Sequence, residues 1–182
     1  MSTFKTKWII LKIIKLKPGE FLYTIFTKDY WKIRCNKKLS KKEKTLDLGY
    51  LINFEIISKE NASIHKIRNI KIISEFNLQK KSFSIINNYL IFLSIVLNKT
   101  PNWSPIYELF DLLQIINSYN NIDDLKLILA KLKTISILWE LWEEHSDPII
   151  KKILKFINCN KIDRILMLSG INEKIEKKLE EL

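Results

Sequence analysis

The spacing of apolar residues changes near residue 80, and this change constrains the fold more than any other feature of the sequence. Before it, short β-branched and aromatic runs alternate with polar residues, a period of two that predicts strands. After it, apolar residues recur every three or four positions, which predicts amphipathic helices. A chain of 182 residues is long enough for one large or two small domains. We therefore expect a β domain over residues 1–78 and an all-α helical domain over residues 79–182, an α+β multidomain chain.

Five short strands are expected in the first domain. They cover residues 8–16, 21–27, 31–35, 50–58 and 64–73, with turn chemistry at Lys17-Pro18-Gly19. In the fourth strand, alternate apolar residues from Tyr50 to Ile56 fall on one face. Five strands with a long polar loop between the third and the fourth fit a small closed or partly open barrel.

Six helices are expected in the second domain. They cover residues 82–98, 106–118, 123–142, 148–157, 161–168 and 172–182. Ser104 and Asp147 are expected N-caps followed by proline, and Asn121 or Asp123 is expected to cap the third helix. The first helix is uncharged, but it is shorter than the roughly 20 residues that a membrane span needs. We expect it to be buried nearly all round in a soluble core.

Positive charge is concentrated in the β domain. Residues 1–81 contain 19 Lys and Arg against 7 Asp and Glu, whereas residues 82–182 contain 12 against 13. A basic β module joined to a neutral helical module suggests a polyanion-binding head on a docking body. Lys12, Lys15 and Lys17 interrupt the apolar start of the chain, so we expect no secretory signal. Two cysteines without a disulfide framework fit a reducing cytoplasm, and binding to DNA would make the protein nucleoid-associated.

A cluster of cations lies on and after the expected third strand, where barrels of this kind present ligand loops. The candidate phosphate ligands are Lys32, Arg34, Lys37, Lys38, Lys41, Lys42 and Lys44. Each neutralised phosphate releases condensed counterions, so affinity should fall steeply with salt. Arg34 is favoured for a specific contact because its guanidinium is a planar fork. The alternative is a solvated lysine face, inflated by a composition rich in Lys.

Three aromatic residues lie near these cations. Tyr30 and Trp31, at the expected hairpin, are candidate base-stacking residues, with barrel core as the alternative. Tyr23, in the second strand, is favoured for the core. In the last strand, Lys66 and Arg68 share a face and extend the candidate track, whereas Lys71 falls on the opposite face. A charged edge strand is the alternative for these cations.

Catalytic and metal chemistry find little support. The acidic and histidine residues at 143–147 lie beyond a helix end and lack the spacing of metal ligands. His65 and Cys35 have no evident base partner, so we expect structural roles for them. Cys35 and Cys159 are far apart and make no disulfide framework. We expect no catalytic residue, no metal and no cofactor.

The most informative motif is Phe-Thr-Lys-Asp-Tyr-Trp-Lys-Ile-Arg at residues 26–34. It resembles the Phe-Thr-x-x-x-Gly-(Arg/Lys)-(Ile/Val)-Arg hairpin of the RecO family of bacterial recombination and repair mediators, which leads into a basic loop. Residues 46–57, 70–76 and 101–113 are similar to later segments of the family, so the likeness covers roughly residues 7–142. Trp31 replaces the hairpin glycine, the family's four-cysteine zinc element is absent, and the C-terminal part is shorter.

The resemblance implies an N-terminal OB-fold, a helical domain and no enzymatic turnover. It also implies binding of single- and double-stranded DNA, annealing of complementary strands, and cooperation with RecR and with the acidic C-terminal tail of single-strand DNA-binding protein (SSB) in loading RecA. Tail docking would need an apolar pocket rimmed by lysines, for which Lys126, Lys131 and Lys133 are candidates. Two other functions stay open: a generic OB-fold module for single-stranded DNA or RNA without a recombination role, and an interaction scaffold whose lysines serve solubility.

Overall fold

The computed structural model describes residues 2–29, 31–40, 43–58, 62–76, 81–101, 106–119, 121–138, 141 and 143–182, with side chains described for all of these except residues 2–6, 31 and 58. The chain divides into two compact units. One comprises Met1–Asn77 and Thr100–Ser118, and the other comprises Leu78–Lys99 and Tyr119–Leu182. The helix in Thr100–Ser118 therefore groups with the barrel, although it lies beyond the expected boundary at residue 78.

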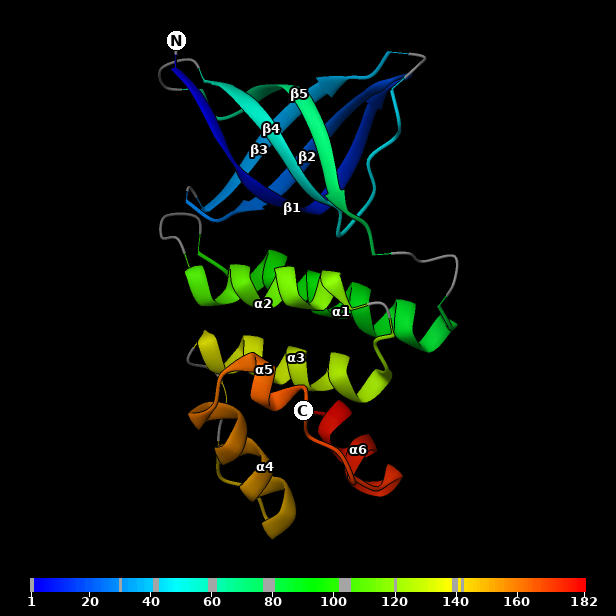
Figure 1. Ribbon diagram of the computed structural model, residues 1–182, viewed down its shortest axis with the longest axis vertical. Coiled ribbons are helices and arrows are strands. Elements are labelled where there is room, and N and C mark those ends of the chain that lie inside the picture. Colours follow the sequence, from blue (N-terminus) through cyan, green and yellow to red (C-terminus); the bar gives the residue numbers. More distant parts are fainter. Residues whose placement is uncertain are drawn as a thin grey trace. The chain divides into compact units, whose positions relative to one another are not determined.

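The first unit is built on a closed five-stranded barrel (Figure 1). Its strands are β1 (Ser2–Lys17), β2 (Glu20–Thr27), β3 (Trp31–Lys38), β4 (Leu51–Ser58) and β5 (His65–Ser74). They close in the order β1-β2-β3-β5-β4, with β3 and β5 parallel and all other neighbours antiparallel. This is an OB-fold barrel, and it confirms the expected fold class.

Local sequence accounts for the strand ends. Pro18 and Gly19 form the turn between β1 and β2, and the φ of +74° at Gly19 is a conformation that a residue without a Cβ adopts at little cost. The first strand is longer than expected because it serves two partners. Residues 2–9 pair with β4 and residues 8–17 pair with β2.

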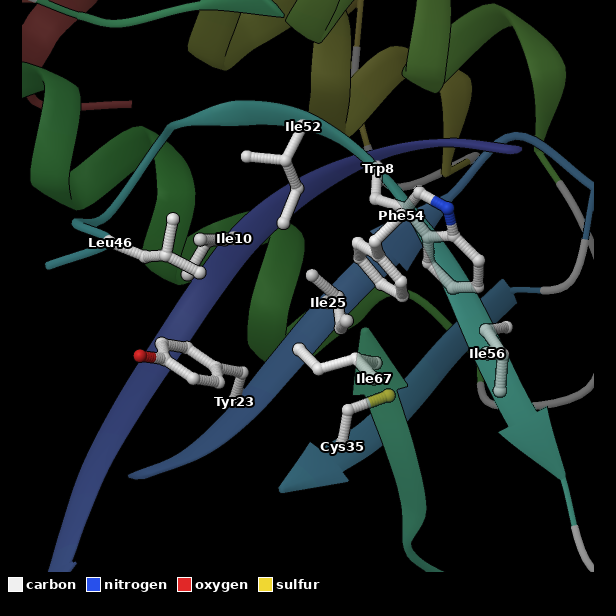
Figure 2. Close-up of a cluster of buried hydrophobic side chains, with 10 residues drawn as sticks. All are labelled: Trp8, Ile10, Tyr23, Ile25, Cys35, Leu46, Ile52, Phe54, Ile56 and Ile67. Atoms are coloured by element: carbon white, nitrogen blue, oxygen red, sulfur yellow. The ribbon is translucent and has the colours of Figure 1, made fainter. Parts of the chain in front are cut away.

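Apolar side chains from all five strands fill the barrel (Figure 2). Trp8 and Phe54 are fully buried and stack with ring centroids 4.5 Å apart. The expected inward face of β4 is confirmed, since Ile52, Phe54 and Ile56 are all in this core. Alternation along a strand places every second side chain on one face, which is why the period of two predicted this core correctly.

The segment between β3 and β4 closes the core. Leu46 is buried in the same cluster as the strand residues (Figure 2). Gly49 donates its N–H to the carbonyl of Ile10 at 2.8 Å, and Asn117 of α2 (Tyr107–Ser118) donates its side-chain amide to the carbonyl of Gly49. The expected polar loop is therefore anchored to the barrel at its C-terminal end.

The second unit consists of helices. They are α1 (Phe83–Lys99), α3 (Asp124–Ile137), α4 (Pro148–Cys159), α5 (Ile162–Ile165) and α6 (Glu173–Glu180). Asp123 and Asp147 cap α3 and α4 as expected, because each carboxylate accepts a backbone N–H in the first turn. The expected cap and proline of α2, Ser104 and Pro105, lie outside the described residues. No helix within the described ranges is long and apolar enough to cross a membrane.

Three helix predictions are corrected. The first helix is not buried nearly all round, because Phe83 is 83% exposed and Leu90 and Ile91 are also exposed. The third helix ends at Ile137, earlier than expected, although apolar spacing continues in the sequence. The fifth is a single turn, since the following N–H groups bond to carbonyls three residues back, which is tighter than α-helical bonding.

Candidate nucleic-acid interface

The outward side chains of β1, β2 and β3 form one surface of the barrel, which we call the outer wall. Tyr23 and Ile25 point into the core, so Thr24 between them points outward. Cys35 is also in the core, and Arg34 before it is exposed. The outer wall comprises Lys12, Ile14, Leu22, Thr24, Arg34, Asn36 and Lys38.

A bulge in β1 brings Lys12 to this wall. The β1–β2 register shifts between Ile10 and Lys12, so the extra residue Leu11 is inserted there. As a result Lys12 lies directly opposite Thr24, and Thr24 lies directly opposite Arg34. Side chains directly opposite in a sheet point the same way. Lys12 and Arg34 therefore flank Thr24, with backbones separated by two strand spacings, or about 10 Å.

The next row across the wall is apolar on β1 and β2. Ile14 is opposite Leu22, Leu22 is opposite Asn36, and Asn36 is paired with Lys66 at the start of β5. Ile14 is 40% exposed. Cations on either side of aliphatic side chains offer phosphate contacts together with an apolar surface for sugars or bases.

Helix α2 covers one end of the wall. Phe26 points outward from β2 but is fully buried, and its ring packs against Phe110 of α2 with centroids 6.3 Å apart. Lys32 is opposite Phe26 and is half-buried there. Burial lowers the pKa of the Lys32 amino group below its ordinary value, because desolvation disfavours the charged form.

The lysines after β3 are less available than the sequence suggests. Lys37 forms an ion pair with Glu43 at 2.7 Å, and its side chain is only 16% exposed. Lys44 pairs with Glu75 and lies 5.7 Å from the ring centroid of Tyr50. Lys38 is exposed at the end of β3, opposite Glu20, whereas Lys41 and Lys42 lie outside the described residues.

Of the three aromatic candidates, only Tyr23 has a side chain that the structure describes. Tyr23 is buried, as favoured from the sequence, and its hydroxyl has no hydrogen-bond partner among the described residues. Burial, with a smaller contribution from the charge of Glu43, raises the pKa of Tyr23 to about 12, so it stays a neutral core residue. Tyr30 and the Trp31 side chain lie outside the described part of the structure.

Cations of β5 continue the basic surface. Lys66 and Arg68 are both exposed and share the outward face, as expected. The expectation that Lys71 points the opposite way is wrong, because Lys71 is exposed on the same face. A bulge at Asn69 shifts the alternation by one residue between Arg68 and Lys71.

Sequence reasoning missed Lys12 for a related reason. In the sequence, Lys12, Lys15 and Lys17 are cations scattered along one strand. The pattern of that strand does not show which of them lies in the same row of the sheet as a cation of β3. The signal that could have found Lys12 is the run of four apolar residues from Trp8 to Leu11. It breaks strict alternation at Leu11, where the bulge lies.

In the helical unit, the lysines considered for tail docking are engaged in packing. Lys126 pairs with Asp123, Lys131 donates to the carbonyl of Glu180, and the amino group of Lys133 lies 3.4 Å from the carbonyl of Ile157. A different hollow of about 450 Å³ lies at the end of α4 and along α5. Its lining residues are Cys159, Asn160, Lys161, Asp163, Arg164 and Met167.

A second hollow, of about 300 Å³, has the opposite character. It is lined by residues of α1, α3 and α6 that include Asp124, Glu173, Glu176 and Glu180. Burial and these neighbouring carboxylates raise the pKa of Glu176. An anionic ligand would be repelled there.

The residues at 143–147 hold the helices in place. Glu144 pairs with Lys151 of α4, and Asp147 caps α4 and pairs with Lys178 of α6. The ring nitrogen Nδ1 of His145 accepts the N–H of Asp147 at 2.9 Å. No group of three or more His, Cys, Asp or Glu side chains within the described ranges is arranged to hold a metal ion. Cys35 is fully buried, and burial raises the pKa of its thiol.

Comparison with known proteins gives no family assignment. No protein-family model and no curated protein matches the chain.

Proposed function

We propose that this protein is a non-catalytic DNA recombination and repair mediator of the RecO type. It binds single- and double-stranded DNA on the barrel, anneals strands coated with SSB, and acts with RecR in loading RecA. The observation that supports this most is the outer wall, where Lys12 and Arg34 flank Thr24 on an OB-fold barrel. OB-folds bind oligonucleotides through the surface of strands 2 and 3 and the loops beside it.

The binding chemistry proposed for the wall is phosphate neutralisation. Arg34 is exposed and has no side-chain partner in the described part of the chain, so its fork is available to a phosphate. Lys12 and Lys38 add charge around it, and Ile14 and Leu22 supply an apolar surface between them. Two strands held and screened by such a surface meet more often, which speeds annealing without bond chemistry.

The proposed docking site for the acidic SSB tail is the hollow at the end of α4. Lys161 and Arg164 supply positive charge there, and Met167, which is 78% exposed, supplies an adaptable apolar surface. Docking of an acidic tail in an apolar pocket rimmed by cations needs both. The acid-lined hollow beside Glu176 is unsuited to the same ligand.

The test is annealing of complementary oligonucleotides that are already coated with SSB, either intact or lacking its tail. Annealing that requires the tail, and that is lost in the double variant Lys161→Glu, Arg164→Glu, is the expected result. The matched control is Lys152→Glu with Lys155→Glu, which removes two exposed lysines of α4 outside the hollow. Absence of annealing on coated strands would overturn the mediator role.

A generic OB-fold module for single-stranded DNA or RNA is the second candidate. It is favoured by one observation, that the exposed cations of the outer wall all belong to the barrel unit and need no helical residue. It predicts tight, salt-dependent binding to bare strands that is unchanged by SSB. The coated-strand assay therefore separates the two functions.

A further inference from the structure

The strand β5 contains a bulge that redirects its charged side chains. Asn69 has a φ of +54°, the left-handed region that Asn tolerates better than most residues. Glu55 is paired with Arg68 and Asn53 with Lys71, so one residue of β4 faces two residues of β5 between those pairs. One extra residue on one strand is the defining feature of a β-bulge.

The bulge lets β5 direct its apolar side chains to the core and its cations to the outward face. Ile67, Ile70 and Ile72 all pack in or against the barrel core. Unbroken alternation would place Ile70 on the face opposite Ile67. With the bulge, Lys66, Arg68 and Lys71 instead share the outward face and are all exposed. Lys66 and Lys71 lie opposite Ile57 and Asn53, which are four residue steps apart on β4, or about 13 Å in an extended strand.

A carboxylate orients Arg68, the central residue in the row formed by Lys66, Arg68 and Lys71. Oε2 of Glu55 accepts hydrogen bonds from Nε of Arg68 at 2.9 Å and from Nδ2 of Asn69 at 3.0 Å. The Glu55 side chain is only 16% exposed, whereas that of Arg68 is 55% exposed. Because Nε is engaged, the guanidinium is held in one orientation, and its terminal N–H groups remain for an acceptor in solvent.

The two lysines of the row differ from Arg68 because no carboxylate neutralises them in the described part of the chain. Neither Lys66 nor Lys71 has an ion-pair partner among the residues that the structure describes. Lys66 pairs with both β3 and β4 through its backbone, so its charge does not serve to protect a sheet edge. The row therefore presents an oriented Arg between two exposed Lys residues.

We propose that Lys66, Arg68 and Lys71 form a second phosphate-binding row, which holds the backbone of a single DNA strand beyond the segment bound by the outer wall. Asn69 is a positioning residue for this row, and Glu55 is a positioning residue for Arg68. This inference rests on the proposed function of the barrel in binding nucleic acid. It adds a surface along which the DNA strand continues. It also adds Lys71, which unbroken alternation would place on the face opposite Lys66 and Arg68.

The experiment measures binding of labelled oligothymidylate to the full chain over a series of salt concentrations. For binding to single-stranded DNA, the slope of log affinity against log salt becomes shallower by about 0.7 for each phosphate contact that is removed. Lys71→Gln is expected to reduce the slope by about 0.7. Lys152→Gln, at an exposed position on α4, removes the same charge elsewhere and is expected to leave the slope unchanged.

Lysine acetylation of the wild-type protein, read by mass spectrometry with and without oligothymidylate, gives an answer that needs no variant. Lys66 and Lys71 are expected to be protected in the complex, and Lys152 is not. Salt-dependent binding that weakens in Arg34→Gln, with Lys71 unprotected and Lys71→Gln unchanged, would overturn the second row and leave the proposed function standing. Failure of the wild-type chain to bind any oligothymidylate would overturn both.

Discussion

Lys12 and Arg34 lie on either side of Thr24 on the outer wall of the barrel, each directly opposite it in its own strand pair. They are 22 positions apart in the sequence, and the β1 bulge at Leu11 sets the register that brings them to the same row. A row of this kind, with a cation on each flank of a small polar residue, is suited to the backbone of a nucleic acid rather than to its base edges.

Replacement of Arg34 by Gln should weaken binding to single-stranded DNA and reduce the salt slope by about 0.7, because one phosphate contact is lost. Fluorescence anisotropy with oligothymidylate at several salt concentrations measures both. Arg164→Gln removes the same charge from α5 in the helical unit and should leave the slope unaltered. Equal losses in the two variants would mean that net charge, and not the outer wall, governs affinity.

Truncation of Phe54 to Ala should lower the free energy of unfolding by about 3–5 kcal/mol, because it removes a fully packed ring that stacks on Trp8 at the centre of the barrel. Urea denaturation followed by tryptophan fluorescence and circular dichroism gives the value. Asn53→Ala, one position away on the exposed face, should change the free energy by less than about 0.5 kcal/mol. A small loss for Phe54→Ala would be inconsistent with this core.

Removal of the Asn117 amide should destabilise the barrel unit through the loop that enters β4. Asn117→Ala leaves the buried carbonyl of Gly49 without this donor, which costs about 1–3 kcal/mol. Asp111→Ala, at an exposed position on the same helix, controls for helix propensity. Hydrogen exchange should show faster exchange at Gly49 and Tyr50 in Asn117→Ala. Unchanged exchange there would show that the loop is held by other contacts.

Stability should depend on the ionisation of Glu43 at acid pH. The side-chain hydrogen bond from Lys37 and the backbone N–H of Ser40 lower the pKa of Glu43 from 4.5 to about 2. A carboxyl group whose pKa is depressed in the folded state contributes stability above its unfolded pKa and loses it as the pH falls through the folded value. The stability advantage of wild type over Glu43→Gln should therefore be constant above pH 4.5 and disappear toward pH 2.

Urea unfolding of both proteins across that range measures the difference. Since Glu43 is at the surface, the effect is expected to be modest and to shrink with added salt. A difference that does not change with pH would mean that the Lys37–Glu43 pair is not formed in solution.

Much of the fold followed from local patterns. The period of two placed Ile52, Phe54 and Ile56 in the core, and Pro18-Gly19 ended β1 close to where the structure ends it. Asp147 before Pro148 predicted the start of α4. These features depend on residues adjacent in the chain, whose backbone preferences and side-chain periodicity act before any tertiary contact.

The ends of the helices and the faces that they bury were predicted less well, because both depend on packing partners. The apolar composition of α1 indicated burial on all sides, yet only Tyr89, Phe92, Leu93 and Val96 are buried. An apolar residue becomes buried only where another element covers it, and composition does not state which face that is.

The sequence by itself determined a basic five-stranded barrel followed by helices, since charge, alternation and helical spacing are all written along the chain. Only the tertiary structure decided which cations share a surface. The bulges at Leu11 and Asn69 bring Lys12 and Lys71 to the outward face, and Glu43 and Glu75 neutralise Lys37 and Lys44. The physical reason is that a bulge is defined by the register with a second strand, and an ion pair by how the folded chain brings two side chains together, so the pattern of one segment does not specify them.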